Sequence, residues 1–162
     1  MECYKILRKE SHSDKLWSLS YFQLPEQYKV QYRVGHESFG VNDSALFTFD
    51  NVFNTYYSFR EFVGGFLNRS FGIYRCEGNN LVNYKGINYF PSLHLVYFDV
   101  EKYWRLFNER KFDDINILYG RSVMPTLDIC IGTLLFKSIT VIRELSDTEI
   151  IESVAKEYEK KW

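Results

Sequence analysis

Hydrophobic and polar residues alternate along several short stretches of the chain, as expected for strands with one buried face. The clearest case runs from Tyr28 to Val34, where every second residue is hydrophobic. Similar or continuous hydrophobic runs predict further strands at residues 5–8, 16–22, 45–49, 71–77, 93–98 and 133–145. A turn at 78–80 and a short strand at 81–84 complete the predicted strands.

Helical spacing replaces alternation in three segments. Asp50 is a candidate N-cap for a helix that runs to about residue 63. Residues 100–107 place hydrophobic side chains at i, i+3, i+4 and i+7, which predicts a short amphipathic helix. Ser146 and Glu149 have the spacing of a capping box and predict a closing helix after them.

The order of these elements favours an α+β fold, because strands precede and follow helices without regular βαβ alternation. We expect a mixed, mainly antiparallel sheet or an open barrel, with two to three helices packed on it. The chain has 162 residues, the usual size of one domain, and no linker or repeat divides it. We therefore expect residues 1–162 to form a single domain.

Aromatic residues are unusually frequent, with 14 Phe, 13 Tyr and 3 Trp making up 19% of the chain. Most should pack in a core, and a subset of Tyr and Trp should form a contact surface. The formal net charge is −1, which disfavours electrostatic binding to nucleic acid or to an anionic membrane.

The cysteines are Cys3, Cys76 and Cys130, an odd number with wide spacing and no CxxC pair. This pattern argues against a disulfide framework and against a zinc site, and it favours a reducing compartment. The first residues do not resemble a signal peptide, and no hydrophobic run has the length of a membrane helix. We expect a cytoplasmic protein without a bound metal.

Strong catalytic motifs are absent: the chain has no phosphate-binding loop, no dinucleotide fingerprint, no HExxH and no GxSxG. Among the histidines, His36 is the most suggestive, because it follows a predicted strand in a loop, where site residues tend to cluster. Two carboxylates brought together by the sheet could serve acid–base chemistry, but their spacing in the sequence does not show that they meet.

The segments YKILRK, LWSL, YKVQYRVGHE, ALFTFDNVFNTYYSF, FGIYRCEG and FKSITVIREL occur in this order along the chain. The arrangement resembles small uncharacterised domains of phage and bacterial proteins, some of which adjoin pentapeptide repeats. The resemblance covers residues 4–78 and 132–145, so residues 79–131 are interpreted as an insertion. It implies a fold and an origin from a phage or mobile element more than an activity.

The same layout also resembles the ADP-ribosyltransferase-like fold, in which a His, a Tyr and a late Glu hold a nicotinamide cofactor. By position, the resemblance implies roles for His36, for Tyr56 or Tyr57, and for Glu144. The His-Gly-Thr motif of that family is absent, since Glu37 follows His36.

Three functional hypotheses follow. The first is a small protein-interaction or host-modulating protein that needs no catalysis and no cofactor, and that binds a protein partner. Its contact residues are expected in the segment that the family resemblance leaves unexplained: Tyr84, Tyr89, Tyr97, Tyr103 and Trp104. The second is an ADP-ribosyltransferase-like enzyme or NAD binder. The third is a nucleic-acid or nucleotide binder that stacks bases on exposed tyrosines.

Overall fold

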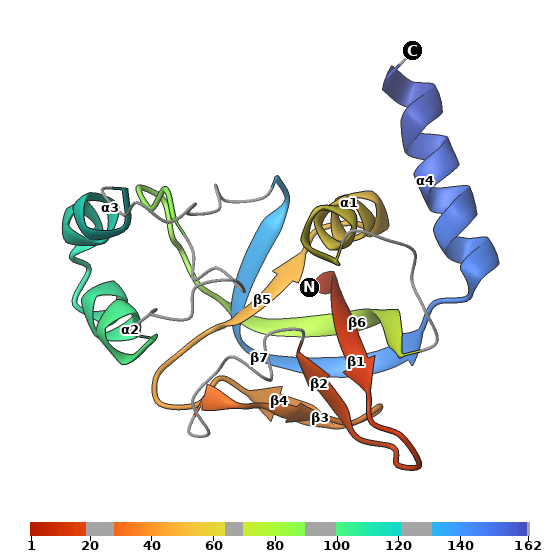
Figure 1. The fold of residues 1–162 in the computed structure, drawn as a ribbon, viewed down its shortest axis with the longest axis horizontal. Coiled ribbons are helices and arrows are strands. Elements are labelled where there is room, and N and C mark those ends of the chain that lie inside the picture. Colours follow the sequence, from red (N-terminus) through yellow and green to blue (C-terminus); the bar gives the residue numbers. More distant parts are fainter. Residues whose placement is uncertain (19–27, 64–69, 90–99, 121–130, 162) are drawn as a thin grey trace.

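The computed structural model describes residues 1–18, 28–63, 70–89, 100–120 and 131–161 (Figure 1). These residues form seven strands and four helices, in the order β1 (Glu2–Lys9), β2 (Leu16–Ser18), β3 (Gln31–Tyr32), β4 (Glu37–Phe39), β5 (Leu46–Phe49), α1 (Val52–Val63), β6 (Phe71–Leu81), α2 (Val100–Asn108), α3 (Phe112–Gly120), β7 (Thr133–Glu144) and α4 (Asp147–Lys161). The predicted α+β class is confirmed. The helix absent from the sequence-based prediction is α3. The strand predicted at 93–98 lies outside the described residues.

Four strands close into a small antiparallel barrel. β1 pairs with β6 and β5, and β7 pairs with the same two strands. The ring therefore runs β1–β6–β7–β5, and its β1–β5 seam rests on the pair of Tyr4 and Phe49. In Figure 1, β7 curves strongly through the centre of the molecule, which allows one strand to border β5 and β4 as well as β6.

Three short strands extend this barrel. β2 pairs with β1, β3 pairs with β2, and β4 pairs with β7, so β3 and β4 are the outer strands. The Ser38 hydroxyl of β4 donates to the Gln31 carbonyl of β3 at 3.1 Å. The strand predicted over 28–34 shortens to two residues, because beyond them Val34 forms only an isolated bridge with Val141.

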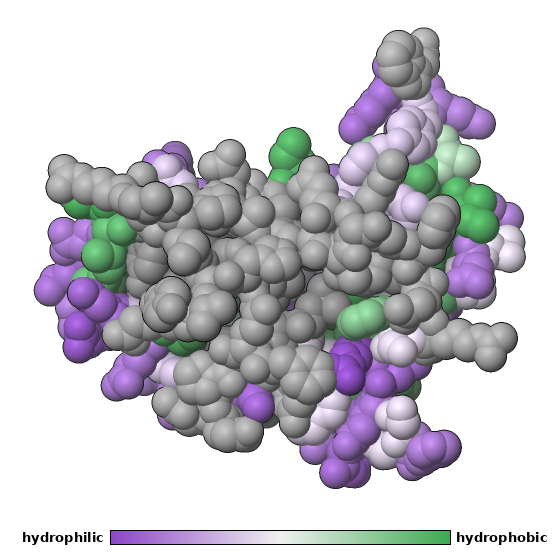
Figure 2. Space-filling model, in the orientation of Figure 1, coloured by the Kyte–Doolittle hydropathy of each residue, from purple (hydrophilic) through white to green (hydrophobic). Residues whose placement is uncertain are grey.

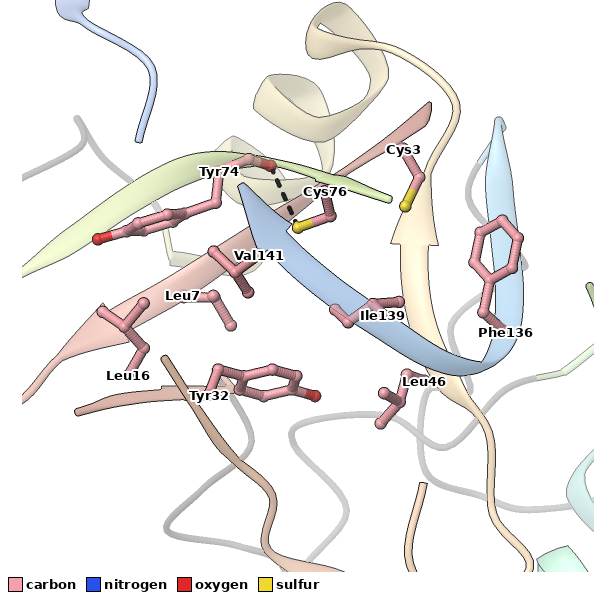
Figure 3. Close-up of a cluster of buried hydrophobic side chains, with 10 residues drawn as sticks. All are labelled: Cys3, Leu7, Leu16, Tyr32, Leu46, Tyr74, Cys76, Phe136, Ile139 and Val141. Atoms are coloured by element: carbon pink, nitrogen blue, oxygen red, sulfur yellow. Dashed lines mark hydrogen bonds between the residues drawn. The ribbon is translucent and has the colours of Figure 1, made fainter. Parts of the chain in front are cut away.

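Alternation along β1 sends odd-numbered residues into the barrel and even-numbered residues toward α1 and α4. Cys3 and Leu7 lie in the barrel core, whereas Ile6 lies in a separate cluster beneath the helices. Figure 3 shows the buried side chains that converge in the barrel. They come from strands far apart in sequence and comprise Cys3, Leu7, Leu16, Tyr32, Leu46, Tyr74, Cys76, Phe136, Ile139 and Val141.

Lys5 is the charged exception in the barrel, with only 8% of its surface exposed. Its Nζ donates to the Phe47 carbonyl at 2.5 Å and lies 5.6 Å from the centre of the Tyr32 ring. Burial lowers the pKa of Lys5 to about 8, because the interior disfavours the charged form. The sequence pattern correctly placed Lys5 in a strand but did not reveal that its side chain faces inward.

Two other cores flank the barrel. On one side, α2 and α3 pack against Phe47 and Leu135 through an aromatic cluster. On the other side, α1 and α4 cover Ile6 and Ile73. Helix α4 begins against this second core through Ile150 and then extends away from the body of the molecule (Figure 1). The buried aromatic residues in the described ranges thus divide among three cores.

The helix starts follow local capping chemistry. The capping box is confirmed, because Glu149 N donates to Ser146 Oγ at 3.2 Å and Ser146 N donates to Glu149 Oε1 at 3.1 Å. The N-cap predicted at Asp50 is wrong by one residue. Asn51 Oδ1 accepts from Asn54 N at 2.8 Å, while the Asp50 carboxylate accepts from the Asn54 side chain at 2.7 Å.

The turn predicted at 78–80 is also wrong, because β6 continues through it to Leu81. Gly78 fits in the strand because the Phe136 ring occupies the space of a side chain, only 2.6 Å from where a Cβ would lie. Leu81 near the end of β6 pairs with Phe136 near the start of β7. Residues 82–132 therefore connect two neighbouring strands, and this connection contains α2 and α3. The predicted insertion at 79–131 overlaps this connection, and its origin as an insertion stays a prediction.

Candidate functional site

A polar pocket of about 200 Å³ opens on the outer face of the barrel, beside α1 and α4. The strands β1, β6 and β7 supply its floor, and the helices supply one wall. Its lining residues are Glu2, Tyr4, Val52, Arg75, Arg143, Leu145, Glu149 and Ser153. We refer to it as the arginine pocket.

Three side chains form a row across the pocket floor. Tyr4 of β1 pairs with Arg75 of β6, and Arg75 pairs in turn with Arg143 of β7. The register shifts between Arg75 and Cys76, because Cys76 pairs with Val141 and one residue of β7 is left over. This bulge brings Arg143 onto the same outer face as Arg75, an effect typical of bulges near binding sites.

Two positive side chains directly opposite each other on adjacent strands repel. Each arginine is therefore matched by its own carboxylate. Arg75 Nε lies 2.8 Å from Glu2 Oε2, and the Arg143 guanidinium donates to both Glu149 oxygens at 2.8 and 2.7 Å. The bidentate pair with Glu149 fixes the plane of the Arg143 guanidinium group, whereas Arg75 has a single contact through Nε.

The site has well-defined protonation states near neutral pH. Burial, followed by the hydrogen bond to Glu2, raises the pKa of Tyr4 to about 12, so the phenol stays protonated and donates to Glu2 at 2.5 Å. The hydrogen bonds from Arg143 and Ser146 lower the pKa of Glu149 to about 2, so that carboxylate stays charged. The pocket thus presents two cations, two anions and a neutral phenol.

Arg75 differs from Arg143 in how much of its donor capacity is used. Arg143 binds Glu149 in a bidentate manner. Arg75 is paired through Nε alone, so within the described part of the chain its two terminal nitrogens have no hydrogen-bond partner. A guanidinium carries five N–H donors in a planar fork that matches carboxylate or phosphate oxygens. Arg75 can therefore donate hydrogen bonds to a second acidic group, supplied by another molecule.

The candidates from the ADP-ribosyltransferase resemblance lie on separate elements. His36 is exposed between β3 and β4, and its backbone N–H donates to Arg33 O at 3.2 Å. Glu144 ends β7 and forms an ion pair with Lys9 at 2.5 Å. Tyr56 and Tyr57 lie on α1, with ring centres 6.2 Å apart.

No contact among the described residues joins His36 or Glu144 to either tyrosine or to the other. None of these four residues lines the arginine pocket. Their predicted shared role in holding a nicotinamide cofactor stays a prediction.

The aromatic residues predicted to contact a partner mostly have packing roles. Tyr103 and Trp104 are buried in the α2 and α3 core, at 0% and 4% exposure. Tyr84 is half-buried and donates to the Thr133 carbonyl, and the backbone of Tyr89 accepts from the Tyr103 hydroxyl at 3.0 Å. Tyr97 lies outside the described residues. Their binding role stays a prediction.

Sequence reasoning missed the arginine pocket because its members are scattered. The sequence pattern identifies Glu149 only as a capping residue and Arg75 only as a member of a strand, and Tyr4 lies just before the first predicted strand. The usable signal was the alternation in FGIYRCE, which sets Arg75 on the face opposite Tyr74 and Cys76. The pairing of Arg75 with Arg143 depends on the bulge, which that alternation does not predict.

No group of three or more His, Cys, Asp or Glu side chains in the described ranges of the chain could hold a metal ion. No helix within the same ranges has the length and hydrophobicity needed to cross a membrane. Comparisons of the chain with protein-family models, curated proteins and solved structures gave no match, so the arginine pocket is interpreted from its own geometry.

Proposed function

We propose that this protein acts by binding a partner protein, and that the arginine pocket receives an acidic side chain from an exposed segment of that partner. The observation that carries the proposal is the unused donor capacity of Arg75 beside a second, fixed arginine. Arginine and tyrosine are also the residues on which binding energy most often concentrates at protein interfaces.

The size of the pocket favours a side chain over a cofactor. Its volume of about 200 Å³ is below the roughly 300–1,000 Å³ of typical small-molecule sites. A carboxylate or phosphate group at the end of a side chain fits such a volume, whereas a dinucleotide far exceeds it. At this pocket, the volume therefore favours an acidic side chain over a dinucleotide.

The carboxylates of Glu2 and Glu149 determine which interaction can hold an acidic group in the pocket. They balance the two arginines, so long-range attraction of anions is weak. Binding then depends on direct hydrogen bonds from Arg75, with the protonated hydroxyl of Tyr4 nearby. Charge-assisted hydrogen bonds of this kind are shorter and stronger than neutral ones.

Helix α4, which lines the pocket through Glu149 and Ser153, also exposes hydrophobic side chains that could extend an interface. Figure 2 shows hydrophobic residues exposed along the lower part of α4, next to hydrophilic ones. In that helix, Ile151 is 67% exposed and Tyr158 is 41% exposed. On a helix these two residues lie away from Glu149 and Ser153, so α4 offers polar groups at the pocket and apolar groups on its other sides.

The test is fluorescence anisotropy with two labelled peptides of the same length, one rich in glutamate and one with phosphoserine in its place. We expect saturable binding of at least one, and the stronger peptide identifies the preferred acidic group. Arg75→Gln should weaken binding by about 10- to 100-fold, as expected for loss of a charge-assisted hydrogen bond. Arg75→Lys should restore the charge but only part of the affinity.

Arg105→Gln is the matched control, because Arg105 is an exposed arginine on α2, far from the pocket. It should leave the affinity unchanged. Equal binding by the wild type and the folded Arg75→Gln variant would refute the proposal, as would the absence of binding to both peptides. Calorimetric titration with NAD⁺ adds a direct test of the alternative, since heat that depends on His36 would favour the enzyme hypothesis.

A further inference from the structure

The interior of the barrel contains two free thiols at directly opposite positions of two adjacent strands. Cys3 of β1 and Cys76 of β6 are direct partners in the antiparallel ladder. They are 0% and 1% exposed and belong to the same buried cluster. Figure 3 shows both sulfur atoms on the interior side of their strands.

The ladder pattern fixes the type of this pair. Lys9 N donates to Ser70 O at 2.7 Å and Gly78 N donates to Met1 O at 2.8 Å. Backbone-bonded pairs alternate along an antiparallel ladder, so they fall on the odd-numbered residues of β1 and include Cys3. The Cα atoms of such a pair lie about 5.5 Å apart, within the roughly 4.4–6.8 Å of disulfides.

Two features of the surroundings act in opposite directions on the pKa of both thiols. Burial raises the pKa of Cys76 to about 12 and also raises that of Cys3. The positive charge of Lys5 acts the other way on both thiols and favours the thiolate. Lys5 follows Cys3 on the same strand face, so its ammonium group stays beside the pair.

We propose that Cys3 and Cys76 form a reversible disulfide across the β1–β6 ladder when the protein meets a hydroperoxide. One thiolate attacks the peroxide, the O–O bond breaks, and the sulfur is oxidised to a sulfenic acid. The second thiol then attacks that sulfur, an S–S bond forms, and water leaves. Overall, two thiols and one hydrogen peroxide give one disulfide and two waters. We name hydrogen peroxide as the oxidant because it is a much smaller molecule than a disulfide reagent, and the two cysteines are 0% and 1% exposed.

The geometry also predicts that this disulfide is easily reduced. In a backbone-bonded pair the Cβ atoms lie near the long end of the cross-strand range, about 5.5 Å, whereas a disulfide needs roughly 3.5–4.5 Å. The two strands must therefore move together, and the Cys76 Sγ must leave its contact with the Tyr74 carbonyl at 3.7 Å. Such strain makes a disulfide more readily reversible.

The experiment uses the full chain with Cys130→Ser, so that two thiols remain. The folded protein is titrated with hydrogen peroxide, unreacted thiols are alkylated, and the intact mass and peptide map are measured. We expect loss of two hydrogens, a cross-linked peptide joining Cys3 to Cys76, and full recovery with a mild thiol reductant. Lys5→Met should slow thiol loss several-fold near pH 8 and shift its pH profile upward, because it removes the charge that favours the thiolate.

Cys3→Ala and Cys76→Ala are the controls, each checked for folding by circular dichroism. Neither should give an intramolecular cross-link. Sulfinic or sulfonic acid at a single cysteine would overturn the proposal, as would disulfide-linked dimers. A cross-link that forms in urea but not under native conditions would also overturn it, because the pairing would then belong to the unfolded chain.

Discussion

Arg143 on β7 and Glu149 on α4 form a bidentate ion pair that joins the end of the sheet to the closing helix. Glu149 is at the same time the distal member of the capping box with Ser146. One carboxylate thus connects three features: the barrel, the start of α4 and the arginine pocket. This shared role makes its titration a sensitive probe of the site.

We predict that Arg143→Gln raises the pKa of Glu149 from about 2 toward its ordinary value of 4.5. The folded-state pKa is lowered, so the stabilisation is present above the unfolded value and is lost as the pH falls from about 4.5 to 2. Carbon-detected NMR of the carboxyl group measures this titration directly. Arg105→Gln should not change it, and an unshifted Glu149 in the Arg143 variant would contradict the ion pair.

Ser146→Ala should lower the free energy of unfolding by about 1 kcal/mol, because it removes the side-chain acceptor for Glu149 N. Urea denaturation followed by circular dichroism measures the change. Thr148→Ala is the matched control, since Thr148 lies in the same turn and has no hydrogen bond of its side chain among the described residues. Equal losses in the two variants would show that the cap does not stabilise α4.

Gly78→Ala should destabilise the protein by about 1–3 kcal/mol, the usual cost of overpacking a core. The added Cβ would lie 2.6 Å from the Phe136 ring, well inside contact distance. Thermal unfolding of Gly78→Ala and of the double variant with Phe136→Leu separates crowding from a backbone effect. Gly78→Ala should cost less stability in the Phe136→Leu background than in the wild type. Equal costs in the two backgrounds would argue against crowding.

Lys5→Met should increase stability most below pH 8, because it removes a buried charge. The pKa of Lys5 falls from 10.5 to about 8 on folding, so between these values the unfolded chain binds more protons. Wild-type stability therefore gains from Lys5 as the pH rises, and the advantage of the variant should shrink by about 1.4 kcal/mol per pH unit.

The other titratable groups facing Lys5 are Cys3, Cys76 and Tyr32, and burial raises the pKa of each. They give the opposite pH dependence in both proteins, so the difference between variant and wild type isolates Lys5. Urea denaturation of both proteins on either side of pH 8 provides the test. A pH-independent difference would show that folding does not lower the pKa of Lys5.

Local chemistry accounts for what could be predicted from the sequence. The capping box at Ser146 needs only side chains three residues apart, and the amphipathic pattern of 100–107 needs only one helix. The strand at 28–34 shows the limit of this reasoning. Its alternation is regular, but a strand also requires a partner, and β2 offers pairing to two residues only.

The arginine pocket could not be predicted for a related reason. Tyr4, Arg75 and Arg143 meet through strand register, and register depends on contacts between segments about 70 residues apart. The bulge beside Arg75 changes which face Arg143 occupies, and a shift by one residue would have sent it inward. The glycine at position 78 was interpreted as a turn because its real constraint, the Phe136 ring, comes from a distant strand.

The position of β7 has a consequence for how the chain folds during synthesis. This strand completes the barrel by pairing with both β5 and β6, yet its residues, 133–144, follow nearly everything else. During synthesis, β5 and β6 would therefore each have one unpaired edge until β7 is made. Contacts of such long sequence separation form slowly. We expect the nascent chain to need protection of these edges, and a copy truncated before β7 to aggregate rather than fold.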